Sequence, residues 1–273
     1  MDTRLTIAEP SALTLLESLG LRCYEDYVSC TRGEVVGCGS TSESRRLTAD
    51  SANAGASDCP IRLYLKVYRY EGRHRRWALL PDKAEIEARN YRILRDHCGL
   101  DTPAVLAFGR RSRDGWLTNG FILTREVPGA RPLEEYVPAP TTRFTESAVH
   151  NAALRQYVLQ ETADLVSRMH AVGFCHVDLQ WRNLRVADGE TDRPRIYILD
   201  SSRGRLLRWR VRREHGRLRD LSSLVKMARR QMSRSEQIRW LRRYLGVRRL
   251  APEHRVLVQT MLYDRSVKDD DPA

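Results

Sequence analysis

Residues 176–200 constrain this chain more than any other stretch, because two acidic residues and an amide surround an apolar strand there. The segment His176-Val-Asp178-Leu-Gln-Trp-Arg-Asn183 places an asparagine five residues after an aspartate. The apolar run Ile196-Tyr-Ile-Leu then ends in Asp200, 22 residues after Asp178. Oxygen ligands of this kind are the ones that a hard divalent cation prefers. The stretch therefore predicts a polar loop followed by a strand that brings a second carboxylate to the same place.

This arrangement matches what ATP-dependent phosphoryl transfer requires of a protein. Asp178 would orient an attacking hydroxyl and accept its proton, since a sugar or serine hydroxyl is too weak an acid to ionise freely. Asn183 and Asp200 would hold Mg²⁺ against the phosphates, and His176 would brace the loop by hydrogen bonding. The alternative is a polar turn with Asx hydrogen bonds. The following strand, which ends in Asp200, favours catalysis.

Lys66 lies in the middle of a largely apolar strand pattern, residues 61–69. It would bind the α- and β-phosphates of the nucleotide and pair with a carboxylate on a nearby helix; an edge lysine that faces water is the alternative. Glu85 and Glu87 are the candidate partners. Glu87 is preferred, because the helical spacing turns it away from the apolar side. That apolar side comprises Ile86, Ile93 and Leu94.

Two backbone segments are candidates for holding the rest of the nucleotide. Gly33, Gly37 and a third glycine, Gly39, indicate a turn whose N–H groups would close over phosphates. The spacing does not match GxGxxG, so an ordinary hairpin turn is the alternative. Glu126 and Val127 follow a strand and precede a break at Pro128-Gly129, where their backbone groups would meet the adenine edge.

Periodicity predicts a strand-rich first half and a helix-rich second half. In residues 1–127 we expect a short helix at 9–19 capped by Ser11, strands within 27–50 and at 61–69, 104–109 and 119–125, and a principal helix at 81–97. Residues 51–58 are small and polar and predict an exposed loop. In residues 128–273 we expect helices at 145–171, 216–232, 234–245 and 252–264, with the catalytic loop at 174–183 and the metal-binding strand end at 196–200.

Charge and composition favour an anionic partner. The formal net charge is +12, and eight arginines fall between Arg203 and Arg219. The planar guanidinium suits phosphate and carboxylate oxygens. Arg203 and Arg205, directly after the proposed metal ligand, are therefore candidates to contact the acceptor substrate or anionic lipid headgroups. A solvated basic face, or an arginine-rich composition inherited from a GC-rich genome, explains the run equally well.

The remaining composition favours a cytoplasmic location. The six cysteines form no CxxC pair and no zinc pattern, which is typical of reduced thiols. No apolar run approaches the roughly 18 residues of a membrane span. The N-terminus has no signal-peptide pattern. We therefore expect a cytoplasmic protein, with peripheral contact with the inner-membrane surface as a further expectation and the oligomeric state left open.

The motifs resemble those of the lipopolysaccharide core kinases, the Kdo and heptose kinases of the protein-kinase-like superfamily. The resemblance covers about residues 27–250 and is carried by Tyr64-Leu-Lys-Val-Tyr68, the segment 83–94, the segment 176–183, Leu199-Asp-Ser-Ser-Arg-Gly204 and the late segment 233–245. It implies an α+β, bilobal protein-kinase-like fold, with an antiparallel-sheet N-terminal lobe that has one helix and a mainly helical C-terminal lobe.

The same resemblance implies the chemistry. Lys66 would bind phosphate and Glu87 would pair with it; Asp178 would be the base, and Asn183 with Asp200 would hold Mg²⁺. ATP would be the donor, and the acceptor would be a sugar hydroxyl of the lipopolysaccharide inner core or a related glycolipid. Ser201-Ser202 replace the Phe-Gly of protein kinases, and no Ala-Pro-Glu segment follows, which disfavours a peptide substrate.

Two alternatives remain open at this point. In the first, the fold is the same but the acceptor is another small molecule, such as an aminoglycoside-like antibiotic, or a protein. In the second, the chain is a basic pseudokinase or binding scaffold. Nucleic acid is the less expected partner, since no nucleic-acid motif with interleaved aromatic residues supports it.

Overall fold

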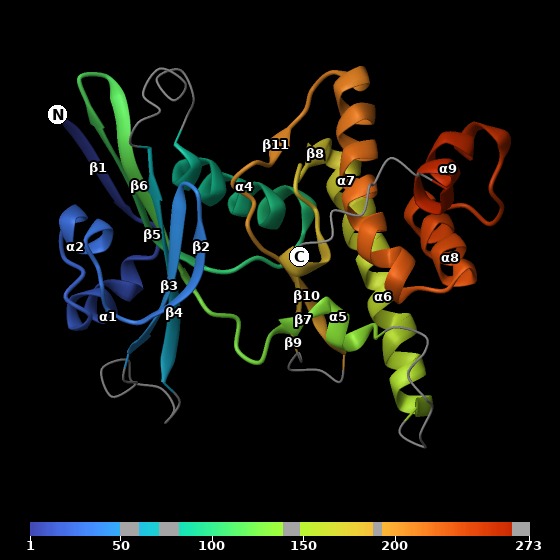
Figure 1. The fold of residues 1–273 in the computed structure, drawn as a ribbon, viewed down its shortest axis with the longest axis horizontal. Helices are drawn as coiled ribbons and strands as arrows, with labels where there is room; N and C mark the ends of the chain where they lie inside the picture. The colour runs from blue at the N-terminus through green and yellow to red at the C-terminus, as the bar shows by residue number, and fades with distance from the viewer. Residues whose placement is uncertain (50–59, 71–81, 139–147, 188–192, 264–273) are drawn as a thin grey trace. The chain divides into compact units, whose positions relative to one another are not determined.

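The chain folds as two compact units (Figure 1). The structure is a computed structural model that describes residues 1–49, 60–70, 82–138, 148–187 and 193–263. Unit 1 comprises Met1–Arg92 and Pro103–Pro128, and unit 2 comprises Ile93–Thr102 and Gly129–Ala273. The loop expected at 51–58 lies outside the described residues.

Unit 1 is built on a six-stranded antiparallel sheet with the order β1-β5-β6-β4-β3-β2. A meander from β2 to β4 pairs with the β5–β6 hairpin, and β1 adds to the far edge. The strands are β1 (Asp2–Ile7), β2 (Glu34–Gly39), β3 (Ser42–Ala49), β4 (Ile61–Arg69), β5 (Val105–Arg113) and β6 (Trp116–Arg125). Lys66 pairs with Ser44 of β3 and Ile122 of β6, so it lies on an interior strand and not at a sheet edge.

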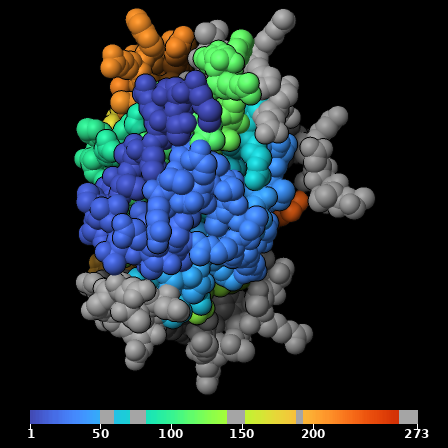
Figure 2. Space-filling view, turned by 90° about the vertical axis from the view of Figure 1, so that its left-hand side faces the viewer, coloured from blue at the N-terminus to red at the C-terminus, as the bar shows by residue number. Residues whose placement is uncertain are grey.

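One face of this sheet carries the apolar core of unit 1. Because side chains alternate along a strand, Leu63 and Leu65 of β4 point to this face, where both are fully buried. The short helices α1 (Leu13–Ser18) and α2 (Tyr24–Val28) supply the other side of the core. The N-terminal residues, blue in Figure 2, cover this face. Tyr27 stacks on Phe121 of β6, with ring centroids 4.2 Å apart.

The other face of the sheet carries the polar residues of β4 and lies against α4 (Lys83–Cys98). Asp82 caps α4, since its carboxylate accepts the backbone N–H of Glu85 at 3.1 Å. The predicted apolar side of this helix needs correction. Leu94 is buried, but Ile86 and Ile93 are only half-buried. The buried positions are instead Ala84, Glu87, Ala88, Asn90, Tyr91, Leu94 and Cys98.

Two local expectations for unit 1 were wrong, and two elements were not expected. Gly37 and Gly39 do not form a turn but lie in β2, where a bulge follows Val35, and the chain reverses at Ser40 and Thr41. Helix α2 had no counterpart among the expectations. Ser11 lies inside a 3₁₀ turn, Pro10–Ala12, and its hydroxyl bonds Glu9 instead of capping a helix. Strand β1 was not expected at all.

Unit 2 is mainly helical. Its helices are α5 (Leu133–Tyr136), α6 (Ala148–Val172), α7 (Arg210–Gln231), α8 (Arg234–Leu245) and α9 (Arg255–Tyr263). Helix α7 begins six residues before the expected start, and a 3₁₀ turn, Pro252–His254, precedes α9. Ser233 and Glu236 form a capping box that starts α8, and Gly246, at φ +67°, ends it. Helix α6 contributes Val158, Leu165, Val166 and Met169 to the buried core, whereas Val172 at its end is half-buried.

Two small sheets hold the polar loop of unit 2. The first has the order β10-β9-β7, with β10 (Arg195–Ile198), β9 (Leu184–Ala187) and β7 (Arg131–Pro132). The second pairs β11 (Arg205–Leu206) with β8 (Phe174–Cys175). The expected catalytic loop runs from β8 through a 3₁₀ turn, Trp181–Asn183, into β9. Within the described ranges, no helix has the length and apolarity that crossing a bilayer demands.

Candidate active site

Hydrogen bonds tie the three segments that carry Asp178, Asn183 and Asp200. The amide Nδ2 of Asn183 donates to the backbone carbonyl of Asp178 at 2.8 Å. The backbone N–H of Leu199 donates to the carbonyl of Asn183 at 2.8 Å, which fixes the residue before Asp200. The Nε2 atom of His176 lies 3.0 Å from the carbonyl oxygen of Leu199, and this is the bracing contact that the sequence predicted. The loop and the strand end are thus held together.

Two residues of this site have left-handed backbones. Val177 has φ +72° and Asp200 has φ +52°. A β-branched residue at positive φ is a steric outlier, and such conformations cost on the order of 1–3 kcal/mol. Contacts with neighbouring residues must offset that cost. The left-handed conformations of Val177 and Asp200 set the direction in which the side chains of Asp178 and Asp200 leave the backbone.

Asp220 of α7 is the residue that holds this strained turn. Its two carboxylate oxygens accept the backbone N–H groups of His176 at 2.8 Å and Val177 at 2.7 Å. Asp220 is fully buried. Sequence reasoning missed it, although a signal exists: Asp220 stands four residues before Leu224, on the helix face that also buries Leu221. An acid on a buried helix face requires a specific partner.

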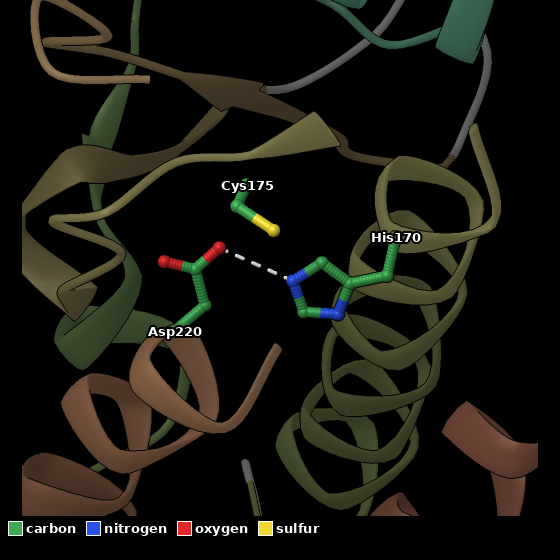
Figure 3. A group of neighbouring side chains, drawn as sticks. All are labelled: His170, Cys175 and Asp220. Atoms are coloured by element: carbon green, nitrogen blue, oxygen red, sulfur yellow. Dashed lines mark hydrogen bonds and ion pairs between the residues drawn. The ribbon is translucent and has the colours of Figure 1, made fainter. Parts of the chain in front are cut away.

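Asp220 also belongs to a buried cluster with His170 and Cys175 (Figure 3). His170 Nε2 lies 3.2 Å from an Asp220 oxygen, and His170 Nδ1 lies 2.9 Å from the hydroxyl of Tyr244 on α8. Burial and, to a smaller extent, Asp220 raise the pKa of the Cys175 thiol to about 12. Because Asp220 bonds both the loop backbone and His170, the cluster supports the loop.

A hydrogen-bond donor and a positively charged group lie beside the carboxylate of Asp178. Gln180 Nε2 donates to Asp178 Oδ1 at 2.7 Å, and a guanidinium nitrogen of Arg182 lies 3.7 Å from Oδ2. The side chain is 22% exposed, so a reactant can reach it. An anionic, oriented carboxylate of this kind can accept a proton from a hydroxyl.

The donor atoms in unit 2 suit Mg²⁺. Because Asn183 Nδ2 is used for the bond to Asp178, its Oδ1 atom is the one left for a cation. Asp200 adds a carboxylate, one oxygen of which accepts the hydroxyl of Ser202 at 3.2 Å. Two hard oxygen donors, with further positions for phosphate and water, are the usual protein contribution to a magnesium site.

In unit 1, Lys66 lies next to Glu87 rather than Glu85. Lys66 Nζ is 3.6 Å from Glu87 Oε2, whereas Glu85 pairs with Arg110 at 3.2 Å. The hydroxyls of Tyr68 and Tyr91 also donate to Glu87, at 2.7 and 2.8 Å. The reason given for preferring Glu87 was wrong, because Glu87 is buried rather than turned away from the core. Two tyrosine hydroxyls and the ammonium group of Lys66 surround the Glu87 side chain, which offsets the cost of burying a polar group.

A second lysine lies beside the same tyrosine. Lys66 Nζ and Lys83 Nζ are 5.3 and 5.7 Å from the ring centroid of Tyr68. Lys83 Nζ also contacts the hydroxyl of Thr41 at 3.2 Å, in the reversal between β2 and β3. The sequence has only four lysines among its 47 basic residues. Two of them therefore flank one ring, a feature that sequence reasoning did not find.

The structure places the other candidate residues as follows. Gly33 precedes β2 at φ +79°, where a Cβ would lie 2.2 Å from the carbonyl oxygen of Arg46, and Gly37 lies within β2. The backbone N–H of Glu126 donates to Arg62 at 2.9 Å, so this group is occupied by the sheet. Val127 follows it, at the end of unit 1. Arg203 and Arg205 are both exposed in unit 2.

A cavity of about 740 Å³ lies between α6 and α8. Leu159 and Trp240 contribute to its lining, and so do several arginines, among them Arg155 and Arg239. None of the residues discussed above as catalytic lines it. The candidate catalytic residues of unit 2 therefore lie in the hydrogen-bonded loop and not at this cavity.

Comparison with known proteins shows that the chain is a member of a kinase family. The family described as "Lipopolysaccharide kinase (Kdo/WaaP) family" matches residues 42–244. This match spans most of the chain, and the chain belongs to that family. The resemblance seen in the motifs is thereby confirmed.

A solved structure agrees on the fold. The structure titled "WaaP in complex with acyl carrier protein" superposes with a TM-score of 0.62, covering 93% of this chain and 92% of that one, at 19% sequence identity. The shared fold is mixed, with an antiparallel sheet and helices. No curated protein matches the chain.

Proposed function

We propose that this protein transfers the γ-phosphoryl group of ATP, with Mg²⁺, to a sugar hydroxyl of the lipopolysaccharide inner core or a related glycolipid. The observation that carries the proposal is the bonded unit formed by Asp178, Asn183 and the residue before Asp200. Family membership supports the phosphotransferase class. Phosphoryl transfer depends on positioning and charge neutralisation, which such a unit supplies.

Each residue has a role in the proposal. Asp178 orients the acceptor hydroxyl and takes its proton as the acceptor oxygen bonds to the γ-phosphorus of ATP and the bond from that phosphorus to the bridging oxygen breaks, which releases ADP. Asn183 and Asp200 would hold the cation, which would neutralise charge on the phosphates. Lys66, fixed by Glu87, binds phosphate oxygens, and Lys83 adds a second ammonium group near the Thr41 reversal. The backbone carbonyl of Glu126 and backbone groups of Gly33, Gly37 and Val127 remain candidates for the rest of the nucleotide.

The acceptor is proposed to be anionic. Arg203 and Arg205 lie shortly after Asp200 in the chain and are exposed. A phosphate or carboxylate on the acceptor sugar would be attracted to their guanidinium groups. Acyl carrier protein is a candidate partner as well, because the solved WaaP structure contains it.

Substitution of Asp178 tests the proposed chemistry. Asp178→Asn keeps the shape but removes the base and should lower the turnover number by about a hundredfold or more. The measurement is transfer of labelled phosphate from ATP to purified inner-core glycolipid. Asp96→Asn, a surface change on α4, is the control and should keep full turnover.

Three results would contradict the proposal. Full turnover of Asp178→Asn would remove Asp178 as the base. Transfer to an aminoglycoside or a protein, but not to the glycolipid, would replace the acceptor. Absence of any Mg²⁺-dependent nucleotide binding would favour a pseudokinase scaffold.

A further inference from the structure

The segment that joins β11 to α7 exposes apolar and basic side chains together. Leu206 is 43% exposed, Trp209 72% and Val211 82%, although large apolar side chains are usually buried. Arg208, Arg210 and Arg212 alternate with them and are exposed too. We call residues 206–212 the β11–α7 patch. Residues 207–209 connect β11 to the first turn of α7 (Figure 1).

Local structure gives no reason for this exposure. Trp209 precedes the first residue of α7, and its side chain makes no cap. The next turn of α7, unlike the patch, is held to the protein by its side chains. Arg213 Nε donates to the carbonyl of Leu207 at 2.7 Å. Arg217 in turn bonds Glu214 and Tyr244. The patch is therefore fixed to a rigid helix, while its own large side chains point into solvent.

We infer that the β11–α7 patch binds the surface of an anionic bilayer. Tryptophan is favoured at the membrane interface, where its ring is half in the acyl region and its N–H reaches water. Arginines beside it gain roughly 1 kcal/mol each near an anionic surface. Leu206 and Val211 add apolar area that enters the same interface. A purely charged partner would not explain the exposed apolar side chains of the patch, and a purely apolar partner would not explain its arginines.

This inference deepens the proposed function, because a glycolipid acceptor is embedded in such a surface. The patch begins six residues after Asp200 in the chain. Within the arginine run 203–219, the patch residues Arg208, Arg210 and Arg212 bind lipid headgroups. Arg213 and Arg217 are instead bound to the fold.

Vesicle binding tests the inference with the full chain and no nucleotide. The probe is vesicles of phosphatidylethanolamine and phosphatidylglycerol, compared with phosphatidylcholine vesicles, in a co-sedimentation assay. Arg208→Gln, Arg210→Gln and Arg212→Gln together should lower the partition coefficient by about a hundredfold, from the loss of three headgroup contacts. Trp209→Ser with Val211→Ser, which leaves the charge unchanged, should lower it by about tenfold or more.

Matched controls separate this surface from general basicity. Arg239→Gln, Arg242→Gln and Arg248→Gln remove the same charge from exposed positions in and after α8 and should bind vesicles like the wild type. Asp178→Asn should bind them equally well, so a failed kinase assay leaves this test intact. Quenching by brominated lipid should reach Trp209 and be lost in Trp209→Phe.

Three outcomes would overturn the inference. The first is equal loss of binding in the α8 control. The second is unchanged binding of Trp209→Ser with Val211→Ser, which would indicate a charged surface for a soluble polyanion. The third is wild-type binding no stronger to the anionic vesicles than to the neutral ones. Circular dichroism verifies that each variant is folded.

Discussion

At the residue scale, Asp82 combines two demands that conflict. It caps α4 and accepts the hydroxyl of Tyr70 at 2.6 Å, but it is fully buried. Burial raises the pKa of its carboxyl to about 6. Asp82 can lie this close to the sheet because residue 120 is glycine; a Cβ at that position would lie 2.4 Å from Asp82 Oδ1.

The raised pKa predicts a pH-dependent stability. Since the folded state binds the Asp82 proton more tightly than the unfolded state, the contribution to stability is present below about pH 4 and is lost as the pH rises to about 6. Asp82→Asn keeps a capping side chain but does not titrate. From pH 4 to 7 the variant should gain up to about 3 kcal/mol of unfolding free energy relative to wild type. Urea unfolding at each pH measures the difference; parallel curves would contradict it.

Single residues also show the limits of sequence reasoning. The choice of Glu87 over Glu85 agreed with the ion pair, but its physical reason was wrong. Helical periodicity located an apolar side and treated acids as exposed. The two tyrosine hydroxyls that let Glu87 be buried come partly from β4, a separate element. A one-dimensional pattern does not contain such a contact.

At the element scale, α7 is packed against β8 through a glycine. A Cβ on Gly216 would lie 2.4 Å from the sulfur of Cys175. Glycine normally weakens a helix by roughly 0.5–1 kcal/mol relative to alanine. An overpacked core costs typically 1–3 kcal/mol, so the clash should outweigh the helical gain.

Gly216→Ala should therefore destabilise the protein by about 1–2 kcal/mol, although alanine is the better helix former. The double variant Cys175→Ala with Gly216→Ala removes the sulfur and should recover most of that loss. Chemical denaturation of these two variants, of the single variant Cys175→Ala and of wild type measures both effects. Stabilisation by Gly216→Ala alone would show that this contact relaxes freely.

Helices and strands with strong periodicity were predicted well, whereas segments that contain glycines or pair with distant strands were not. Helix α8 was expected with the observed bounds, because a capping serine and a stop glycine flank its apolar spacing. The two strands expected within 27–50 are present as β2 and β3, but the turn between them was expected at 33–39 and lies at Ser40 and Thr41, because Gly37 and Gly39 suggested a turn. Strand β1 was missed because its partner β5 lies about a hundred residues later, and pairing over that distance leaves no local signal.

At the scale of the whole molecule, ligand binding should raise stability. If ATP with Mg²⁺ binds only the folded chain, a ligand concentration of about 100 times Kd adds about 2.7 kcal/mol. Thermal unfolding with and without nucleotide measures this. Lys66→Met should reduce the shift, and Asp200→Asn should remove its dependence on Mg²⁺. A shift that is the same in all three proteins would contradict the assignment of these ligands.

The sequence by itself determined the family, the polar loop at 176–183 and the oxygen donors at 178, 183 and 200, because these depend on residue identity at short spacing. Only the tertiary structure decided that Glu87 neighbours Lys66, that Lys83 flanks the same tyrosine, and that Asp220 supports the turn at Val177. Those contacts join residues that lie 15 to 44 positions apart in the chain. Their geometry follows from how strands and helices pack, and packing is a property of the folded chain.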